Sequence, residues 1–206
     1  LVSEVFKQGH FESLDGSIAV GHVRYATAGG RTINNAQPFM NSFKMGSIAL
    51  CHNGQLVNYE ELREMLEDGG STFSSSSDTE VILKLIVRKF IENGGKLGSG
   101  EKEKFATKEN RKRFIDAVIQ AVRLIKGSFA LCIMTENMLI GVRDPNGIRP
   151  LCLGQAPYIL ASESCAIDSV NGKFVRDIKP GEIVVIDKEG VNSVYDLQLV
   201  QKTKKQ

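Results

Sequence analysis

The pattern of apolar and polar positions divides the chain into strands near both ends and a block of helices between them. Apolar residues at helical spacing predict three helices, one after Asn58, one after Ser77 and one over residues 111–126. Short apolar runs bounded by Gly, Asn and Pro predict strands. The predicted strands cover residues 18–25, 47–51, 128–134, 138–142, 158–161 and 182–186, and a short helix is expected near 163–170.

The helix starts and the turns have signals of their own. Asn58 and Ser77 are each followed three residues later by glutamate, the pattern of a helix-capping box. His-Asn-Gly at 52–54 predicts a tight turn that stops the strand at 47–51, since Asn-Gly tolerates positive φ. Asp-Pro-Asn-Gly at 144–147 has the residues of a type I turn.

Strands joined to neighbours by short turns, with the helices grouped rather than alternating, predict an α+β fold with antiparallel sheet. Residues 1–195 read as one domain. Residues 93–113 are glycine-rich and then charged, without an apolar period, so we expect a surface insertion there. Residues 196–206 read as a C-terminal tail or the start of a linker.

Composition excludes several classes of protein. Hydrophobic residues make up 42% of the chain and charged residues 24%, the balance of a soluble globular protein. The net charge of +2 is too small to indicate nucleic-acid binding. No apolar run approaches the roughly 18 residues of a membrane span. The four cysteines lack CxxC spacing, which favours a reducing compartment over a disulfide framework.

Three short segments are candidates for chemistry, and each has two interpretations. Arg24, in Gly-His-Val-Arg-Tyr-Ala-Thr, is either an exposed strand residue or a partly buried fork for a carboxylate. Asn53-Gly54 is either a turn or an amide and a backbone N–H that stabilise an oxyanion. Asp78 either stabilises a helix start or binds a ligand ammonium. His22 and His52 lack metal-ligand spacing, so we expect no metal site and a structural role for both.

In this order and at these spacings, the three segments resemble those of class II glutamine amidotransferases, which belong to the N-terminal-nucleophile hydrolases. The resemblance spans residues 1–195 and implies an αββα sandwich of two antiparallel sheets. It implies that Arg24 binds the α-carboxylate of glutamine and Asp78 its α-ammonium. Asn53 and Gly54 would form the oxyanion hole. Tyr25 and Thr27 would belong to the flap that closes over bound glutamine.

Arg-Asp-Pro-Asn-Gly-Ile-Arg-Pro-Leu at 143–151 and Ala-Ser-Glu-Ser-Cys-Ala-Ile-Asp at 161–168 resemble the amidophosphoribosyltransferase family within this class. That resemblance implies transfer of ammonia to phosphoribosyl pyrophosphate, which forms phosphoribosylamine in the first committed step of purine synthesis. Two alternatives remain open. One is another class II amidotransferase, such as glucosamine-6-phosphate synthase. The other is a non-catalytic glutamine-binding module.

The chain departs from the family pattern at its first residue. The family nucleophile is an N-terminal cysteine, whereas residue 1 is leucine and the first cysteine is Cys51. We therefore expect a sandwich truncated at its N-terminal edge and inactive by itself, with Cys51 a buried, inert thiol.

The resemblance also implies features outside the chain. A phosphoribosyltransferase domain of the same polypeptide would hold Mg²⁺, and no cofactor is expected in this domain. The complete protein is expected to be a homo-oligomer in the cytoplasm, or in the plastid if it comes from a plant.

Overall fold

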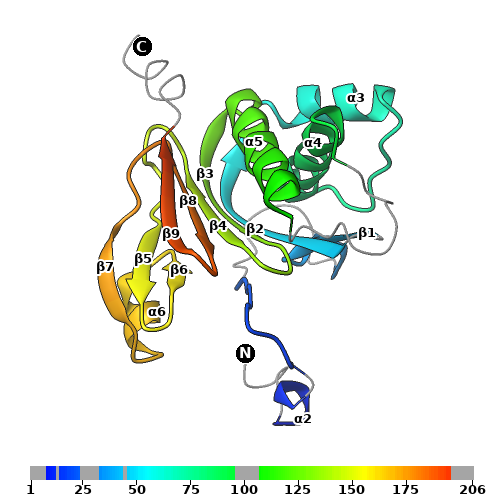
Figure 1. Ribbon diagram of the computed structural model, residues 1–206. Helices are drawn as coiled ribbons and strands as arrows, with labels where there is room; N and C mark the ends of the chain where they lie inside the picture. The colour runs from blue at the N-terminus through cyan, green and yellow to red at the C-terminus, as the bar shows by residue number, and fades with distance from the viewer. Residues whose placement is uncertain (1–7, 13, 24–32, 44–45, 96–106, 196–206) are drawn as a thin grey trace.

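The computed structural model describes residues 8–12, 14–23, 33–43, 46–95 and 107–195 of the chain (Figure 1). Its helices are α2 Gln8–Phe11, the 3-10 turn η1 Ile33–Asn35, α3 Tyr59–Asp68, α4 Asp78–Glu92, α5 Lys108–Leu124 and α6 Ser164–Asp168. Its strands are β1 Phe39–Phe43, β2 Gly46–Leu56, β3 Gly127–Met134, β4 Leu139–Arg143, β5 Cys152–Gln155, β6 Ile159–Ala161, β7 Lys173–Asp177, β8 Glu182–Asp187 and β9 Gly190–Tyr195.

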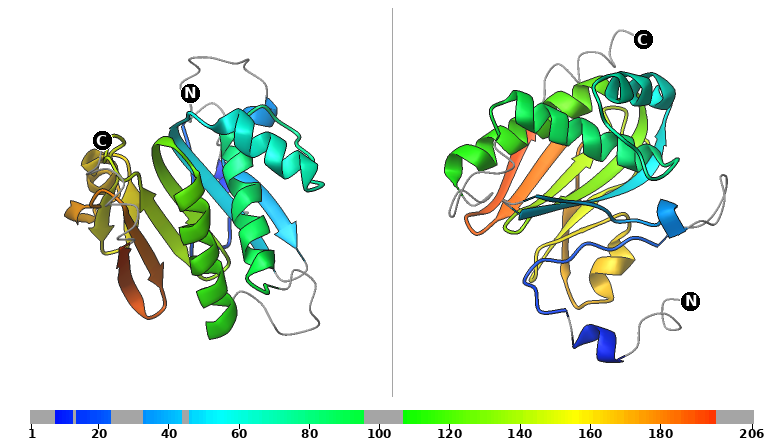
Figure 2. Two further views of the ribbon diagram at one scale, coloured as in Figure 1. Left: turned by 90° about the horizontal axis from the view of Figure 1, so that it is seen from above. Right: turned by 90° about the vertical axis from the view of Figure 1, so that its right-hand side faces the viewer.

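The strands form two antiparallel sheets. The larger has the order β1-β2-β3-β4-β8-β9 and the smaller the order β6-β5-β7. Helices α3, α4 and α5 cover one face of the larger sheet, and the smaller sheet with α6 lies on the other side (Figures 1 and 2). The predicted α+β fold with an αββα arrangement of layers is therefore confirmed. No helix in the described part of the chain combines the length and apolar character needed to cross a membrane.

Period-two alternation along β3 and β8 builds two apolar layers. Phe129, Leu131 and Ile133 of β3 pack toward the helices, in a cluster with buried residues of α4 and α5. Ala130 of β3 and Val184 of β8 instead belong to a second cluster, shared with residues of the smaller sheet. Both faces of the central strands are consequently buried.

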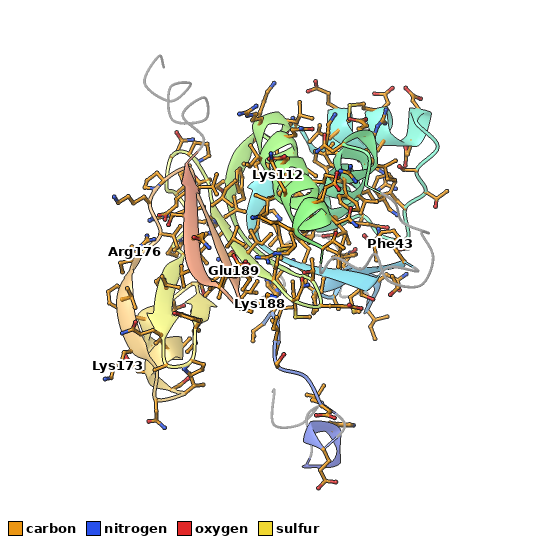
Figure 3. All side chains as sticks on the ribbon, viewed as in Figure 1. Phe43, Lys112, Lys173, Arg176, Lys188 and Glu189 are labelled. Carbon is orange, nitrogen blue, oxygen red and sulfur yellow. The ribbon has the colours of Figure 1, made fainter. Side chains whose placement is uncertain are left out.

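An ion pair between a half-buried arginine and a buried glutamate joins the two sheets. Glu182 of β8 is fully buried, and Arg176 of β7, labelled in Figure 3, donates to its two carboxylate oxygens at 2.9 and 2.7 Å. The hydroxyl of Ser193 and the backbone N–H of Lys179 donate to the same carboxylate, each at 2.7 Å. Burial by itself raises the pKa of Glu182, but these hydrogen bonds outweigh it and hold the pKa below its ordinary value.

The three long helices are confirmed, with differences at their ends. Ser77 caps α4 by accepting from the N–H of Thr79. Asn58 precedes α3 but does not cap it, because its side chain bonds Leu124 O and Lys126 N, each at 2.9 Å. Helix α5 begins at Lys108, so the last part of the expected insertion at 93–113 is helical, and residues 96–106 lie outside the described residues.

The loop after β4 is built as predicted. The N–H of Gly147 donates to Asp144 O at 3.0 Å, closing the turn. The buried Asp144 carboxylate accepts from three backbone N–H groups of the same loop. Arg143 donates to the carbonyl oxygens of Gly147, Arg149 and Ile178. All but one of these contacts lie within the loop, and the bond to Ile178 O ties the loop to the chain after β7, so the segment has a structural explanation.

Two strand predictions are wrong. Residues 18–23, the described part of the strand expected at 18–25, form no ladder, because an apolar run becomes a strand only beside a bonding partner. The turn expected at His-Asn-Gly 52–54 is instead part of β2, which continues to Leu56. Strands β1, β5, β7 and β9 were not predicted.

Candidate functional site

The second half of β2 has one edge that β1 does not cover. The register of β1 ends where Phe39 lies opposite Leu50. Two residues further along β2, the side chain of Gln37 takes the place of a strand. The N–H of His52 donates to Gln37 Oε1 at 2.6 Å, and Gln37 Nε2 donates to His52 O at 3.1 Å. The edge of β2 beyond His52 therefore has no strand from β1 on it.

Gly54 lies in the middle of this edge. Leu56 N–H, four residues after His52, donates to Asp78 Oδ2 at 3.1 Å. In an antiparallel strand, alternate residues direct their N–H groups to the same edge. The N–H groups of His52 and Leu56 both point to the edge that β1 leaves uncovered. The N–H of Gly54 therefore points to the same edge, between the side chains of Gln37 and Asp78.

Gly54 cannot carry a side chain without a shift of the backbone. Its φ is +149°, and a Cβ there would overlap the carbonyl oxygen of Ser128 in β3 and lie 2.9 Å from His52 Nε2. The Asn-Gly pair thus marks a close approach of two strands rather than a reversal of the chain. This is the physical reason that the predicted turn was wrong.

We expect Gly54→Ala to lower the free energy of unfolding by about 2–5 kcal/mol, because backbone strain adds to overpacking. Urea denaturation measures this. Gly70→Ala is a matched control, since Gly70 also has positive φ, +86°, but open space where Cβ would be. Its cost should be about 1 kcal/mol, from the backbone alone. Equal costs at the two positions would contradict the close approach.

Asn53 and Asp78 lie at this edge on opposite faces of the larger sheet. Asn53 is exposed on β2 and pairs with Ala130 of β3, which packs toward the smaller sheet. Asp78 is the first residue of α4, on the helical side, and its side chain keeps 22% of its surface exposed. The sheet edge and the helix start together bring two of the predicted site segments into one place.

His52 is in contact with the Asp78 carboxylate. Its Nδ1 lies 3.4 Å from Asp78 Oδ1 and 3.5 Å from the hydroxyl oxygen of Thr79. Burial by itself raises the pKa of Asp78, but the hydrogen bond and electrostatic interaction with His52 and the N–H groups of Leu56 and Thr79 outweigh it. The pKa of Asp78 is therefore below its ordinary value, and the carboxylate is ionised at neutral pH.

The serines at 74–77, before α4, form hydrogen bonds that stabilise the loop. Glu80 is buried, and its carboxylate accepts from the backbone N–H and the hydroxyl of both Ser74 and Ser75. Ser76 exchanges hydrogen bonds with Asn35 of η1. Burial raises the pKa of Glu80, but the serine hydrogen bonds outweigh it and leave the pKa below its ordinary value of 4.5. The loop is thus fixed in the orientation that starts α4 beside β2.

We expect Glu80→Gln to cost about 1–3 kcal/mol of unfolding free energy at pH 7, since hydrogen bonds to a charged group are lost. A carboxylate with a lowered folded pKa stabilises the protein above its unfolded pKa, and this contribution is lost as pH falls through the folded pKa. The difference between wild type and variant should therefore shrink below about pH 4.5. Unfolding measured across pH, with exposed Glu64→Gln as control, tests this. A difference independent of pH would refute it.

The sequence-predicted residues are only partly placed. Arg24, Tyr25 and Thr27 lie outside the described residues. The contacts of Gln37 with His52 were missed and have no local signal, because the two residues are 15 positions apart. His52, expected to be a structural donor, is in contact with a predicted site residue. Within the described ranges, no group of three or more His, Cys, Asp or Glu side chains could hold a metal ion.

Comparison with known proteins gives consistent matches. The family described as "Glutamine amidotransferase domain" matches residues 22–169. Amidophosphoribosyltransferase 1, chloroplastic, of Arabidopsis thaliana is 42% identical over 196 residues, which are 94% of this chain and 31% of that protein.

Two solved structures share the fold at high identity. The structure of "the allosteric regulatory enzyme of purine biosynthesis" has a TM-score of 0.79 at 41% identity, over 95% of this chain and 38% of its own. Glutamine phosphoribosylpyrophosphate amidotransferase from B. subtilis, complexed with ADP and GMP, has a TM-score of 0.68 at 39% identity, over 84% and 34%. The chain thus spans about a third of the length of the proteins it matches.

Proposed function

This chain belongs to the family of glutamine amidotransferase domains, and on that premise we propose that it binds glutamine at the edge of β2 that β1 leaves uncovered. The residues at this edge provide the groups that stabilise hydrolysis of the glutamine side-chain amide. One observation carries the proposal. The N–H of Leu56, two residues after Gly54, donates to the ionised carboxylate of Asp78, so Gly54 and Asp78 lie at the same edge of β2. The Gly54 N–H can donate to the oxygen of the glutamine side-chain amide, and the negative charge of Asp78 can bind the α-ammonium at the other end of the molecule.

Each residue has a role that follows from its chemistry. Asp78 accepts hydrogen bonds from the α-ammonium of glutamine, and Arg24 binds the α-carboxylate with its planar fork. The side-chain amide of Asn53 and the N–H of Gly54 donate to the oxyanion that forms when the amide carbon is attacked. Tyr25 and Thr27 belong to the flap that keeps water from the covalent intermediate.

We propose further that the natural polypeptide containing this chain transfers the released ammonia to phosphoribosyl pyrophosphate. Glutamine and water give glutamate and ammonia, and ammonia displaces pyrophosphate to give phosphoribosylamine. The support is the identity to proteins named amidophosphoribosyltransferase and glutamine phosphoribosylpyrophosphate amidotransferase. The transfer takes place in a phosphoribosyltransferase domain with Mg²⁺, in a homo-oligomer located in the cytoplasm or, as for the Arabidopsis relative, in a plastid.

Paired rates from two ammonia sources test the proposal in the natural polypeptide. Arg24→Lys and Asp78→Asn should each lower kcat/KM for glutamine about ten- to hundredfold, the effect of losing one charge-assisted hydrogen bond. Synthesis from free ammonia should stay unchanged, because ammonia bypasses the glutamine site. Asp68→Asn, at an exposed carboxylate that ends α3, is the matched control.

The melting temperature of each variant is measured beside the two rates. If a variant loses both rates equally and also melts earlier, that residue supports the fold and not glutamine binding. Glutamine binding without turnover in the wild-type polypeptide would favour the non-catalytic module. Turnover of glutamine with a sugar phosphate other than phosphoribosyl pyrophosphate as acceptor would favour a different class II amidotransferase.

A further inference from the structure

His52 was expected to have only a structural role, but it lies beside the candidate site. It is 3% exposed and lies on β2, where Gln37 holds its backbone N–H and C=O. Its ring extends along the strand between two site residues, with Nδ1 facing Asp78 and Nε2 beside the place that a Cβ of Gly54 would occupy. The ring therefore contacts both the residue that binds the ammonium and the residue of the oxyanion hole.

The partners of the ring determine which nitrogen carries the proton. Nδ1 lies 3.4 Å from Asp78 Oδ1 and 3.5 Å from the hydroxyl oxygen of Thr79. The Asp78 carboxylate is ionised and only accepts hydrogen bonds, whereas a hydroxyl can accept or donate, so a proton on Nδ1 suits both neighbours. In the neutral ring Nε2 is then an acceptor. Nε2 is buried, and no residue in the described part of the chain donates to it. A buried polar atom without a partner destabilises the fold, so packing alone would favour an apolar residue of similar size. What histidine adds at this position is the N–H toward Asp78.

We propose that His52 is a positioning residue for glutamine: its Nδ1–H holds the Asp78 carboxylate in the orientation that binds the substrate α-ammonium. The proposal rests on the proposed function. Nδ1–H of His52 and N–H of Leu56 each occupy a different oxygen of Asp78, at 3.4 and 3.1 Å. Each oxygen keeps a second lone pair. Two fixed donors on two oxygens set the plane of the carboxylate, and its exposed part is left to the ammonium.

The test compares three substitutions of one residue in the natural polypeptide. His52→Leu keeps an apolar volume but no donor. In His52→Asn the amide nitrogen takes the place of Nδ1, and in His52→Gln the longer side chain places its amide near Nε2 instead. Thr135→Val, a buried hydroxyl removed at the turn between β3 and β4, controls for loss of a buried polar group away from the site.

We expect His52→Leu and His52→Gln to raise KM for glutamine at least tenfold, with kcat changed less than about twofold, since ground-state binding is what is lost. His52→Asn should restore KM to within about threefold of wild type. Synthesis from free ammonia should be unchanged in all three, and Thr135→Val should leave both KM and kcat unchanged. A purely structural histidine would not be rescued by asparagine and would not separate KM from kcat.

The outcome also separates this proposal from the function on which it rests. If Asp78→Asn raises KM for glutamine but His52→Leu does not, His52 has no positioning role and the glutamine site stands. If Asp78→Asn leaves KM unchanged, the proposed function fails first. Should His52→Leu not fold, the comparison of His52→Asn with His52→Gln decides the question, and equal KM values in those two variants would overturn the proposal.

Discussion

A polypeptide of these 206 residues that begins at Leu1 is expected to release no ammonia from glutamine. The resemblance assigns the attack to an N-terminal cysteine, and the cysteines present offer no replacement. Cys51 is 5% exposed, and burial raises the pKa of its thiol to about 11. Burial likewise raises the pKa of Cys132 to about 12. At neutral pH these thiols are protonated, and the thiolate is the nucleophile.

The two remaining thiols also have raised pKa values. Burial is the main cause for Cys152, which donates a hydrogen bond to Ala161 O. For the exposed Cys165 the main cause is its hydrogen bond to the Glu163 carboxylate. A coupled assay for glutamate measures the activity, with Cys51→Ala as the matched variant. Turnover that disappears in Cys51→Ala would identify Cys51 as a nucleophile. Turnover that survives in Cys51→Ala would contradict the assignment of the attack to an N-terminal cysteine alone.

Asn53→Ala is expected to lower kcat for glutamine-dependent synthesis in the natural polypeptide by about 10²–10³-fold, the cost of removing one donor from an oxyanion hole. The effect appears in kcat because the oxyanion exists only in the transition state and intermediate. Synthesis from free ammonia should not change. The melting temperature should not change either, because the Asn53 side chain is exposed.

Gln55 gives the control for this substitution. It is also exposed and lies two residues further along β2, so its side chain points to the same face of the sheet as Asn53. Gln55→Ala removes a similar amide from the same strand and should leave both rates unchanged. If the two variants lose kcat equally, the loss reflects a disturbed strand and Asn53 does not donate to the oxyanion.

Local signals determined much of this fold. The start of α4 was predicted from Ser77, which caps it, and α5 from its apolar spacing, because a helix makes its bonds within four residues. Helix α3 begins where predicted, although the Asn58 side chain bonds Leu124 and Lys126 and does not cap it. Strands β3 and β4 and the Asp144–Gly147 turn were predicted from apolar runs and turn residues, which are also signals within a few consecutive residues. Asn53, Gly54 and Asp78 became candidates through the order of three short motifs, and the family that these motifs indicated is confirmed.

The tertiary structure decided what depends on contacts between distant residues. A positive φ at Gly54 is compatible with a turn or with a strand, and only the pairing of Gly54 with β3, where Ser128 lies close to it, selects the strand. The start of α4 beside the sheet edge brings Asp78 to Leu56, 22 residues earlier, and to His52, 26 residues earlier. The sequence specifies which side chains are able to bind a ligand, but burial and the alignment of strand edges determine which of them are in contact. For that reason the residue types of the site were determined by the sequence, and the contacts of His52 and Gln37 only by the fold.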